Sequence, residues 1–192
     1  MRDPTGPRGW YSRGYLPHYD SPETIQHIVF RTADSLPGFA QLDALTDFHE
    51  RQKAIGQELD RGMGSRPLAN PAAAKIVEDA LLHFDGSRYR LLAWCVIPNH
   101  VHVLTEQIEG FHLPDIVHSW KSFTALAINR LQETSGLFWA REYYDRYMRN
   151  EEQTQAAIFY IEDNPVKAGL VSCAQEWLFT SARHRDPRGT EA

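Results

Sequence analysis

One apolar run decides the fold: Trp94-Cys95-Val96-Ile97-Pro98-Asn99-His100-Val101-His102-Val103-Leu104. Pro98 has no amide donor and interrupts strand pairing, so the run predicts two strands, 88–97 and 100–107. Successive side chains of a strand point to opposite faces. His100 and His102 therefore share one face, while Val101 and Val103 face a core on the other. Two imidazoles on one face suit a metal ion, although half-exposed histidines without a ligand are the alternative.

Further elements are predicted on both sides of this run. Asn70 is the expected N-cap of a helix that starts at Pro71. Apolar residues at three- and four-residue steps predict a second helix after the strand pair. The predicted strands are 24–31, 88–97, 100–107 and 138–148, and the predicted helices are 41–61, 71–84, 114–131 and 151–163. This order is βαββαβ-like, which predicts an α+β fold with an antiparallel sheet and helices on one face.

Length and composition indicate a single globular domain. The chain has 192 residues, of which 42% are hydrophobic and 23% charged. No apolar stretch reaches the length of a membrane span, and the N-terminus does not resemble a secretory signal. We interpret the two cysteines as reduced packing residues of a cytoplasmic protein. The expected organisation is an extended arm over 1–22, a domain over 23–182 and a mobile tail over 183–192.

The charge balance is mildly acidic, with 20 Lys and Arg against 25 Asp and Glu. This argues weakly against a protein coated in nucleic acid, but a local basic groove depends on placement rather than on the sum. Arginines lie among aromatic residues near Arg13 and Tyr15 and again near Arg146. Such stretches suit unpaired bases, which stack on rings while guanidinium groups hold phosphates. Ordinary amphipathic surface is the alternative interpretation of each stretch.

A second candidate element lies on the last predicted helix. Tyr160 and Asn164 are four residues apart and so share a helix face. Tyr160 can present a phenol to a metal held by the histidines, while the Asn164 side-chain oxygen completes the coordination. The alternative is a packed tyrosine at a helix end, with Asn164 as a capping residue before Pro165.

Together these residue types suit phosphoryl transfer to a tyrosine. Two imidazoles and an amide oxygen leave positions open on a divalent ion, which would neutralise charge in the transition state. The ordinary pKa of a phenol is about 10, so it needs activation by a metal or a base. A phosphotyrosine link keeps the phosphodiester energy and can be reversed by a 3′-hydroxyl. Imidazole ligands favour Mn²⁺ over Mg²⁺, although Mg²⁺ is abundant in cells.

Several segments resemble the HUH single-strand transposases, and within them the REP-associated tyrosine transposases. The matching segments run from about residue 13 to 180 and are Arg13-Gly14-Tyr15-Leu16-Pro17-His18, Phe30-Arg31, Pro98-Asn99-His100-Val101-His102-Val103-Leu104, Trp120-Lys121-Ser122-Phe123-Thr124, Glu142-Tyr143-Tyr144-Asp145-Arg146-Tyr147 and Tyr160-Ile161-Glu162-Asp163-Asn164-Pro165-Val166-Lys167-Ala168-Gly169-Leu170-Val171.

The resemblance implies a ferredoxin-like sheet core and a single catalytic tyrosine. It makes Tyr160 the nucleophile, His100 and His102 metal ligands, and Asn164 a third ligand for Mg²⁺ or Mn²⁺. It further implies cleavage of single-stranded DNA beside hairpins formed by repetitive extragenic palindromes, with a 5′-phosphotyrosine and a free 3′-hydroxyl as products. The candidate DNA contacts are Arg13, Tyr15, Lys121 and Arg146.

The expected setting is the bacterial cytoplasm, in association with the nucleoid, as a monomer or homodimer without a membrane partner. Three other functions stay open. The chain can be an HUH nickase of replication or conjugation, a hairpin-binding repressor that does not cut, or a metallohydrolase that uses water instead of Tyr160. The hydrolase leaves Tyr160 unexplained and lacks an identified general base.

Overall fold

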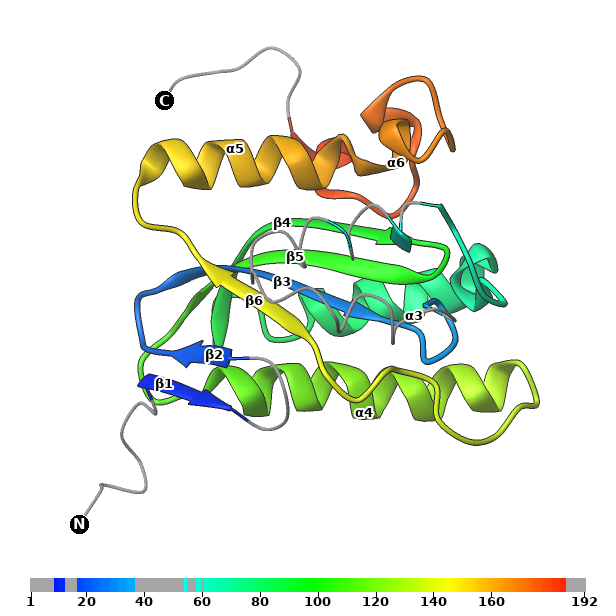
Figure 1. Ribbon diagram of the computed structural model, residues 1–192, viewed down its shortest axis with the longest axis horizontal. Helices are drawn as coiled ribbons and strands as arrows, with labels where there is room; N and C mark the ends of the chain where they lie inside the picture. Colours follow the sequence, from blue (N-terminus) through cyan, green and yellow to red (C-terminus); the bar gives the residue numbers. More distant parts are fainter. Residues whose placement is uncertain (1–8, 13–16, 37–53, 55–57, 60, 186–192) are drawn as a thin grey trace.

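A four-stranded antiparallel sheet forms the centre of the computed structural model, which describes residues 9–12, 17–36, 54, 58–59 and 61–185. Its strand order is β4-β5-β3-β6 (Figure 1). The strands are β3 (Ile25–Arg31), β4 (Tyr89–Ile97), β5 (His100–Gln107) and β6 (Tyr144–Tyr147). With α3 (Pro71–Leu82) and α4 (Leu113–Leu131), they give the order β3-α3-β4-β5-α4-β6. The predicted ferredoxin-like α+β class is therefore confirmed.

Helices α3 and α4 cover one face of the sheet and bury the main core (Figure 1). Ile28, Phe30, Val101 and Val103 point into this core from the two central strands, as the alternation predicts. Asn70 caps α3, because its side chain accepts a hydrogen bond from the Ala72 amide at 2.9 Å.

A chain of buried polar contacts fixes α4 against the sheet. The Trp120 indole nitrogen donates to the Tyr89 hydroxyl at 2.9 Å, and that hydroxyl donates to the Leu81 carbonyl at 2.6 Å. These hydrogen bonds join α4 to β4 and β4 to α3. They also satisfy buried polar groups that would otherwise lack a hydrogen-bond partner.

The opposite face of the sheet is covered by α5 (Glu151–Glu162), which follows the βαββαβ core (Figure 1). Ile161 packs there against Ala93, Cys95 and Leu104. Helices α3 and α4 share one face as expected, but the position of α5 on the opposite face was not predicted. This second layer matters because it carries Tyr160 over the face to which the histidines point.

The predicted arm contains a two-stranded hairpin of β1 (Gly9–Ser12) and β2 (Pro17–Asp20). Asp145 on β6 holds it through the Tyr19 amide at 2.9 Å and through the His18 ring. Asp20 accepts a hydrogen bond from the Leu113 amide at 3.0 Å, so the hairpin also satisfies the start of α4.

The remaining elements are short. They are α6 (Asn164–Lys167), η1 (Pro67–Ala69), η2 (Ala174–Glu176) and η3 (Ser181–His184). Arg185 donates to the Leu92 carbonyl at 2.7 Å, so chain packing continues at least to this residue. The division into arm, domain and tail stays a prediction.

Three expectations differ from the structure or fall outside it. Strand β6 spans only four residues of the predicted strand 138–148. Cys95 is buried as expected, but Cys173 is exposed, so its assignment as a packing residue is wrong. The predicted helix 41–61 lies largely outside the described residues. No helix in the described part of the chain has both the length and the apolarity needed to cross a membrane.

Candidate active site

His100 and His102 lie on central strand β5 and point to the face covered by α5. Both side chains are buried, and their Nε2 atoms lie 2.9 Å apart. The proline break places His100 as the first residue of β5, opposite Ile97 at the end of β4. The structure therefore brings together the two imidazoles in the way that the alternation predicts.

A third histidine, His27, completes this layer and was missed in the sequence. Its Nε2 lies 3.0 Å from Nδ1 of His102, across the β3–β5 pair. The alternation of β3 carries the signal, because Ile28 and Phe30 enter the main core and His27 must face the other way. Which strands are neighbours, however, is set by topology and not by the local pattern.

Asn99 orients His100 from the turn between β4 and β5. Its Oδ1 accepts a hydrogen bond from Nδ1 of His100 at 2.9 Å. Its Nδ2 donates to the carbonyls of Leu59 and Met63, each at 3.2 Å. The amide is thus fixed at both ends, and His100 keeps its proton on Nδ1 and its lone pair on Nε2.

Asn164 and Tyr160 reach the histidines from above the sheet, at the junction of α5 and α6. Asn164 is fully buried, and its Nδ2 lies 3.2 Å from Nε2 of His102. The ring centroid of half-buried Tyr160 lies 5.7 Å from that of His102 in an edge-on arrangement. The structure therefore places all four predicted catalytic and metal-binding residues in one site, although their roles remain predictions.

Burial keeps the imidazoles neutral. It lowers the pKa of His27 to about 4, with a further contribution from the positive charge of Arg146. Burial and the neighbouring His27 lower the pKa of His100 to about 3. Burial, assisted by His100, His27 and Lys167, also holds the pKa of His102 well below its ordinary value. Neutral imidazole is the form that binds metal ions.

The donor atoms fit a divalent cation. If Asn164 donates to Nε2 of His102, both His100 and His102 direct Nε2 lone pairs toward each other at 2.9 Å. Two nitrogens each about 2.1 Å from one ion lie about 3 Å apart when they subtend a right angle. Oδ1 of Asn164 is buried without a hydrogen-bond partner, and rotating the amide brings this oxygen to His102.

Among the described residues, no three His, Cys, Asp or Glu side chains have the arrangement of a metal site. The buried Oδ1 of Asn164, which has no hydrogen-bond partner among the described residues, is a donor of another type beside the two imidazoles. His100, His102 and Asn164 would hold the ion, with Asn99 and His27 behind the two imidazoles.

Two cations flank the site. The Lys167 ammonium lies 4.6 Å from the ring centroid of Tyr160. Arg146 is exposed on β6 and pairs in register with His27, so its side chain leaves the sheet on the histidine face. The structure therefore places Arg146 on the histidine face, while its contact with DNA stays a prediction. Lys167 is an additional basic residue that the sequence interpretation did not select.

The other predicted DNA contacts lie elsewhere. Lys121 is on α4, across the sheet from the histidines, and its Nζ donates to the carbonyls of Ala140 at 2.8 Å and Arg141 at 2.9 Å. It thus fixes the segment before β6, and the structure does not bring it to the histidine site. Arg13 and Tyr15 lie outside the described residues.

Comparisons with known proteins find relatives of this sequence. Residues 73–164, which include both histidines, Tyr160 and Asn164, match the family described as "Transposase IS200 like". A "REP-associated tyrosine transposase" of Escherichia coli is 29% identical over 100 residues, or 51% of this chain and 56% of that protein. A Haemophilus influenzae relative, whose name includes the same description, is 26% identical over 108 residues, or 51% of this chain and 61% of that protein. The matches thus span little more than half of the relatives' length.

A solved structure resembles the whole fold. It is the structure of a REP-associated tyrosine transposase bound to a REP hairpin, with a TM-score of 0.60 and 16% sequence identity. The similarity covers 93% of this chain and 92% of that chain. The similarity therefore extends well beyond residues 73–164 and includes the sheet that carries the histidines.

Proposed function

We propose that the chain is a metal-dependent DNA nickase and strand transferase. The premise is that it belongs with the IS200-like transposases and the REP-associated tyrosine transposases. Its substrate is single-stranded DNA next to a palindromic hairpin. The observation that carries the proposal is the convergence of His100, His102 and Asn164 beside half-buried Tyr160. A tyrosine next to such a donor set suits phosphoryl transfer better than hydrolysis.

In the proposed reaction, the Tyr160 hydroxyl oxygen attacks the scissile phosphorus. The new bond joins the Tyr160 oxygen to phosphorus, and the bond from phosphorus to the 3′ oxygen breaks. The phenol loses its proton, and the departing 3′ oxygen gains one. The products are a 5′-phosphotyrosine and a free 3′-hydroxyl, and attack by a 3′-hydroxyl reverses the step.

The surrounding side chains position the phosphate and the ligands. A bound divalent ion supplies charge neutralisation at the phosphate. Lys167 beside Tyr160 and Arg146 beside His27 add positive charge to this face, which favours the approach of the DNA backbone. Asn99 and His27 hold the Nδ1 atoms of His100 and His102, which would leave the two Nε2 atoms free to bind the ion.

A denaturing gel tests the proposal. The protein is mixed with Mn²⁺ and a pool of hairpin oligonucleotides with randomised single-stranded flanks, because the target sequence is unknown. We expect shortened DNA and a covalent protein–DNA band. Both should disappear in Tyr160→Phe and persist in Tyr147→Phe, which removes a hydroxyl from β6 on the face opposite Arg146.

The other outcomes identify the alternatives. Cleavage that survives Tyr160→Phe would contradict the proposal and support a metallohydrolase. If the protein binds the hairpin DNA but does not cleave it with any divalent ion, the result would support a hairpin-binding repressor. His100→Ala should abolish cutting while largely preserving binding, because backbone contacts supply most of the affinity.

A further inference from the structure

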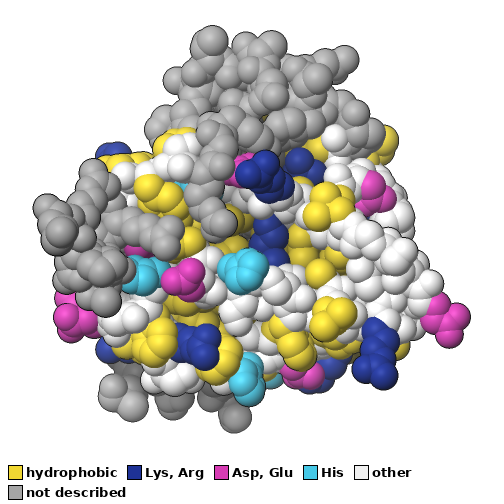
Figure 2. Space-filling model, turned by 90° about the horizontal axis from the view of Figure 1, so that it is seen from below, with side chains coloured by type: hydrophobic (Ala, Val, Ile, Leu, Met, Phe, Trp, Pro, Cys, Tyr) yellow, Lys and Arg dark blue, Asp and Glu magenta, His cyan; other side chains and the backbone are white. Residues whose placement is uncertain are grey.

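A cavity lies across the sheet from the histidines, between α4 and the segment that leads into β6. Its volume is about 120 Å³. Figure 2 looks onto this side of the molecule, where basic and histidine side chains lie among hydrophobic ones. Neither the proposed cleavage reaction nor any predicted site residue except Lys121 involves this cavity.

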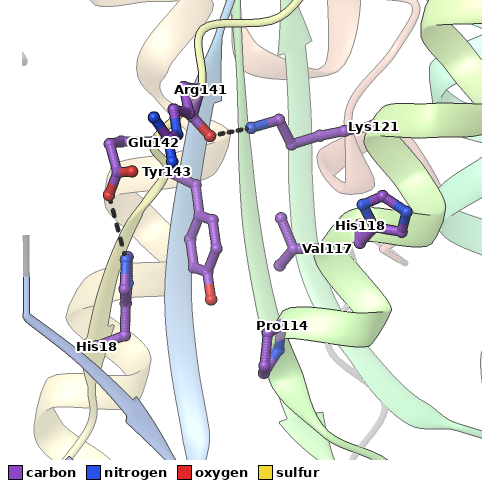
Figure 3. A pocket seen from close by; sticks show the side chains of 8 residues that line it. All are labelled: His18, Pro114, Val117, His118, Lys121, Arg141, Glu142 and Tyr143. Carbon is purple, nitrogen blue, oxygen red and sulfur yellow. Dashed lines mark hydrogen bonds and ion pairs between the residues drawn. The ribbon is translucent and has the colours of Figure 1, made fainter. Parts of the chain in front are cut away.

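The cavity is shaped like a slot for a flat group. The Tyr143 ring forms one wall, and Pro114 and Val117 of α4 lie opposite (Figure 3). The ring of buried His18 stacks behind Tyr143 with centroids 4.4 Å apart, and the Tyr143 hydroxyl lies 2.9 Å from that of Tyr11. The tyrosine wall is thus held in place. A closed cavity of about 150 Å³ holds benzene, so this slot of about 120 Å³, open at its mouth, admits the amino-bearing six-membered ring of a base and leaves the second ring of a purine at the mouth.

A buried carboxylate adds a polar requirement to the slot. The Glu142 side chain lines the cavity and is only 8% exposed. Its Oε2 is buried without a hydrogen-bond partner among the described residues and lies 3.5 Å from Nε2 of His18. Because a carboxylate only accepts hydrogen bonds and the ion pair with His18 is long, at 3.5 Å, this group keeps acceptor capacity for a ligand with N–H donors.

The mouth of the slot is basic. His118 and Arg141 are exposed at the edge of the cavity, and Lys121 stands between them on the α4 side (Figure 3). When a ring enters the slot, the group attached to that ring therefore lies at the mouth, beside positively charged side chains. An aromatic wall, an internal acceptor and a cationic mouth together match a nucleotide, whose base is flat and whose phosphates are anionic.

We propose that this cavity binds one unpaired DNA base that carries an exocyclic amino group, with Glu142 as the residue that selects it. The proposal rests on the DNA-binding part of the proposed function and not on cleavage. Cytosine, adenine and guanine each present an amino group, and acidic side chains accept hydrogen bonds from such groups. Thymine offers one N–H between two carbonyl oxygens, and these oxygens are repelled by a carboxylate.

Binding of short oligonucleotides to the full chain tests the proposal. The probes are fluorescein-labelled 12-mers of thymidine with one central guest base, read by fluorescence anisotropy. Cytosine, adenine or guanine as guest should bind about tenfold more tightly than thymine, as expected for one hydrogen bond to a charged group. Glu142→Gln should remove most of this difference. Asp115→Asn, which neutralises an exposed carboxylate of α4, should preserve it.

A second variant covers the case in which Glu142→Gln is unstable. His118→Trp places a large ring at the mouth from an exposed helix position and should reduce the affinity of all three amino-bearing guests to that of thymine. Equal affinity for all four guests, or a preference that survives His118→Trp, would overturn the base pocket while the cleavage proposal stands. Failure of every oligonucleotide, hairpins included, to bind would overturn both.

Discussion

His27 Nε2 lies 3.0 Å from Nδ1 of His102, so the central strand pair places a third imidazole behind a predicted metal ligand. A partner on the far nitrogen of a metal-binding histidine fixes the ring and its tautomer, and its loss typically costs 10- to 100-fold in metal affinity. We therefore expect His27→Phe to weaken Mn²⁺ binding by about that factor. Titration calorimetry measures the effect, and an unchanged affinity would contradict the assigned role.

Asn99 provides a similar test at His100. Asn99→Ala removes the acceptor for Nδ1 of His100 and both bonds to the 59–63 segment. Weaker Mn²⁺ binding and a loss of about 1–3 kcal/mol in the free energy of unfolding are expected. Asn99→Asp keeps the acceptor and should retain more of the metal affinity than Asn99→Ala. Equal affinity in the two variants would argue that Asn99 acts on the loop alone.

The third ligand can be tested by exchanging its donor. Asn164→Asp supplies a carboxylate oxygen at the same position and should bind Mn²⁺ at least as tightly as the wild type, whereas Asn164→Leu should bind it more weakly. At a metal concentration 100 times Kd, stabilisation by about 2.7 kcal/mol raises Tm by roughly 5–10 °C. Thermal unfolding with and without Mn²⁺ measures this shift. A full shift in Asn164→Leu would exclude Asn164 as a ligand.

The buried imidazoles also predict acid sensitivity of the metal-free protein. The folded pKa values of His27 and His100, about 4 and about 3, lie below the unfolded value of 6.5. The unfolded chain therefore takes up protons first as the pH falls below 6.5, and the folded state loses stability. His27 alone accounts for a loss on the order of 3 kcal/mol between pH 6.5 and 4.

Urea denaturation across this pH range measures that loss. His27→Phe removes one titrating group and should flatten the dependence of the unfolding free energy on pH. A wild-type free energy that stays constant from pH 6.5 to 4, or an unchanged slope in His27→Phe, would show that the imidazole does not titrate in this way.

Local patterns predicted the parts of the site that depend on a single element. Alternation along 100–103 placed both histidines on one face, and the four-residue step placed Tyr160 and Asn164 near each other. Each of these relationships lies within one strand or one helical stretch. The order of strands and helices was sufficient for the βαββαβ core, because few topologies satisfy it.

The features of the site that the sequence did not predict depend on contacts between segments far apart in the chain. His27 joins the site only because β3 lies beside β5, and no property of residues 24–31 alone selects that neighbour. The pairing of β1 with β2 needed a turn signal that the Pro- and Gly-rich arm obscured. Two predicted DNA contacts are also separated by the topology, since Arg146 lies on the histidine face and Lys121 lies across the sheet.

During the proposed reaction Tyr160 becomes covalently joined to DNA. Trypsin releases residues 150–167 as one peptide, and Tyr160 is its single tyrosine. After reaction with the hairpin pool and nuclease digestion, mass spectrometry should find this peptide carrying a 5′-linked nucleotide on Tyr160. Cleaved DNA with an unmodified peptide, or an adduct on another residue, would contradict the account.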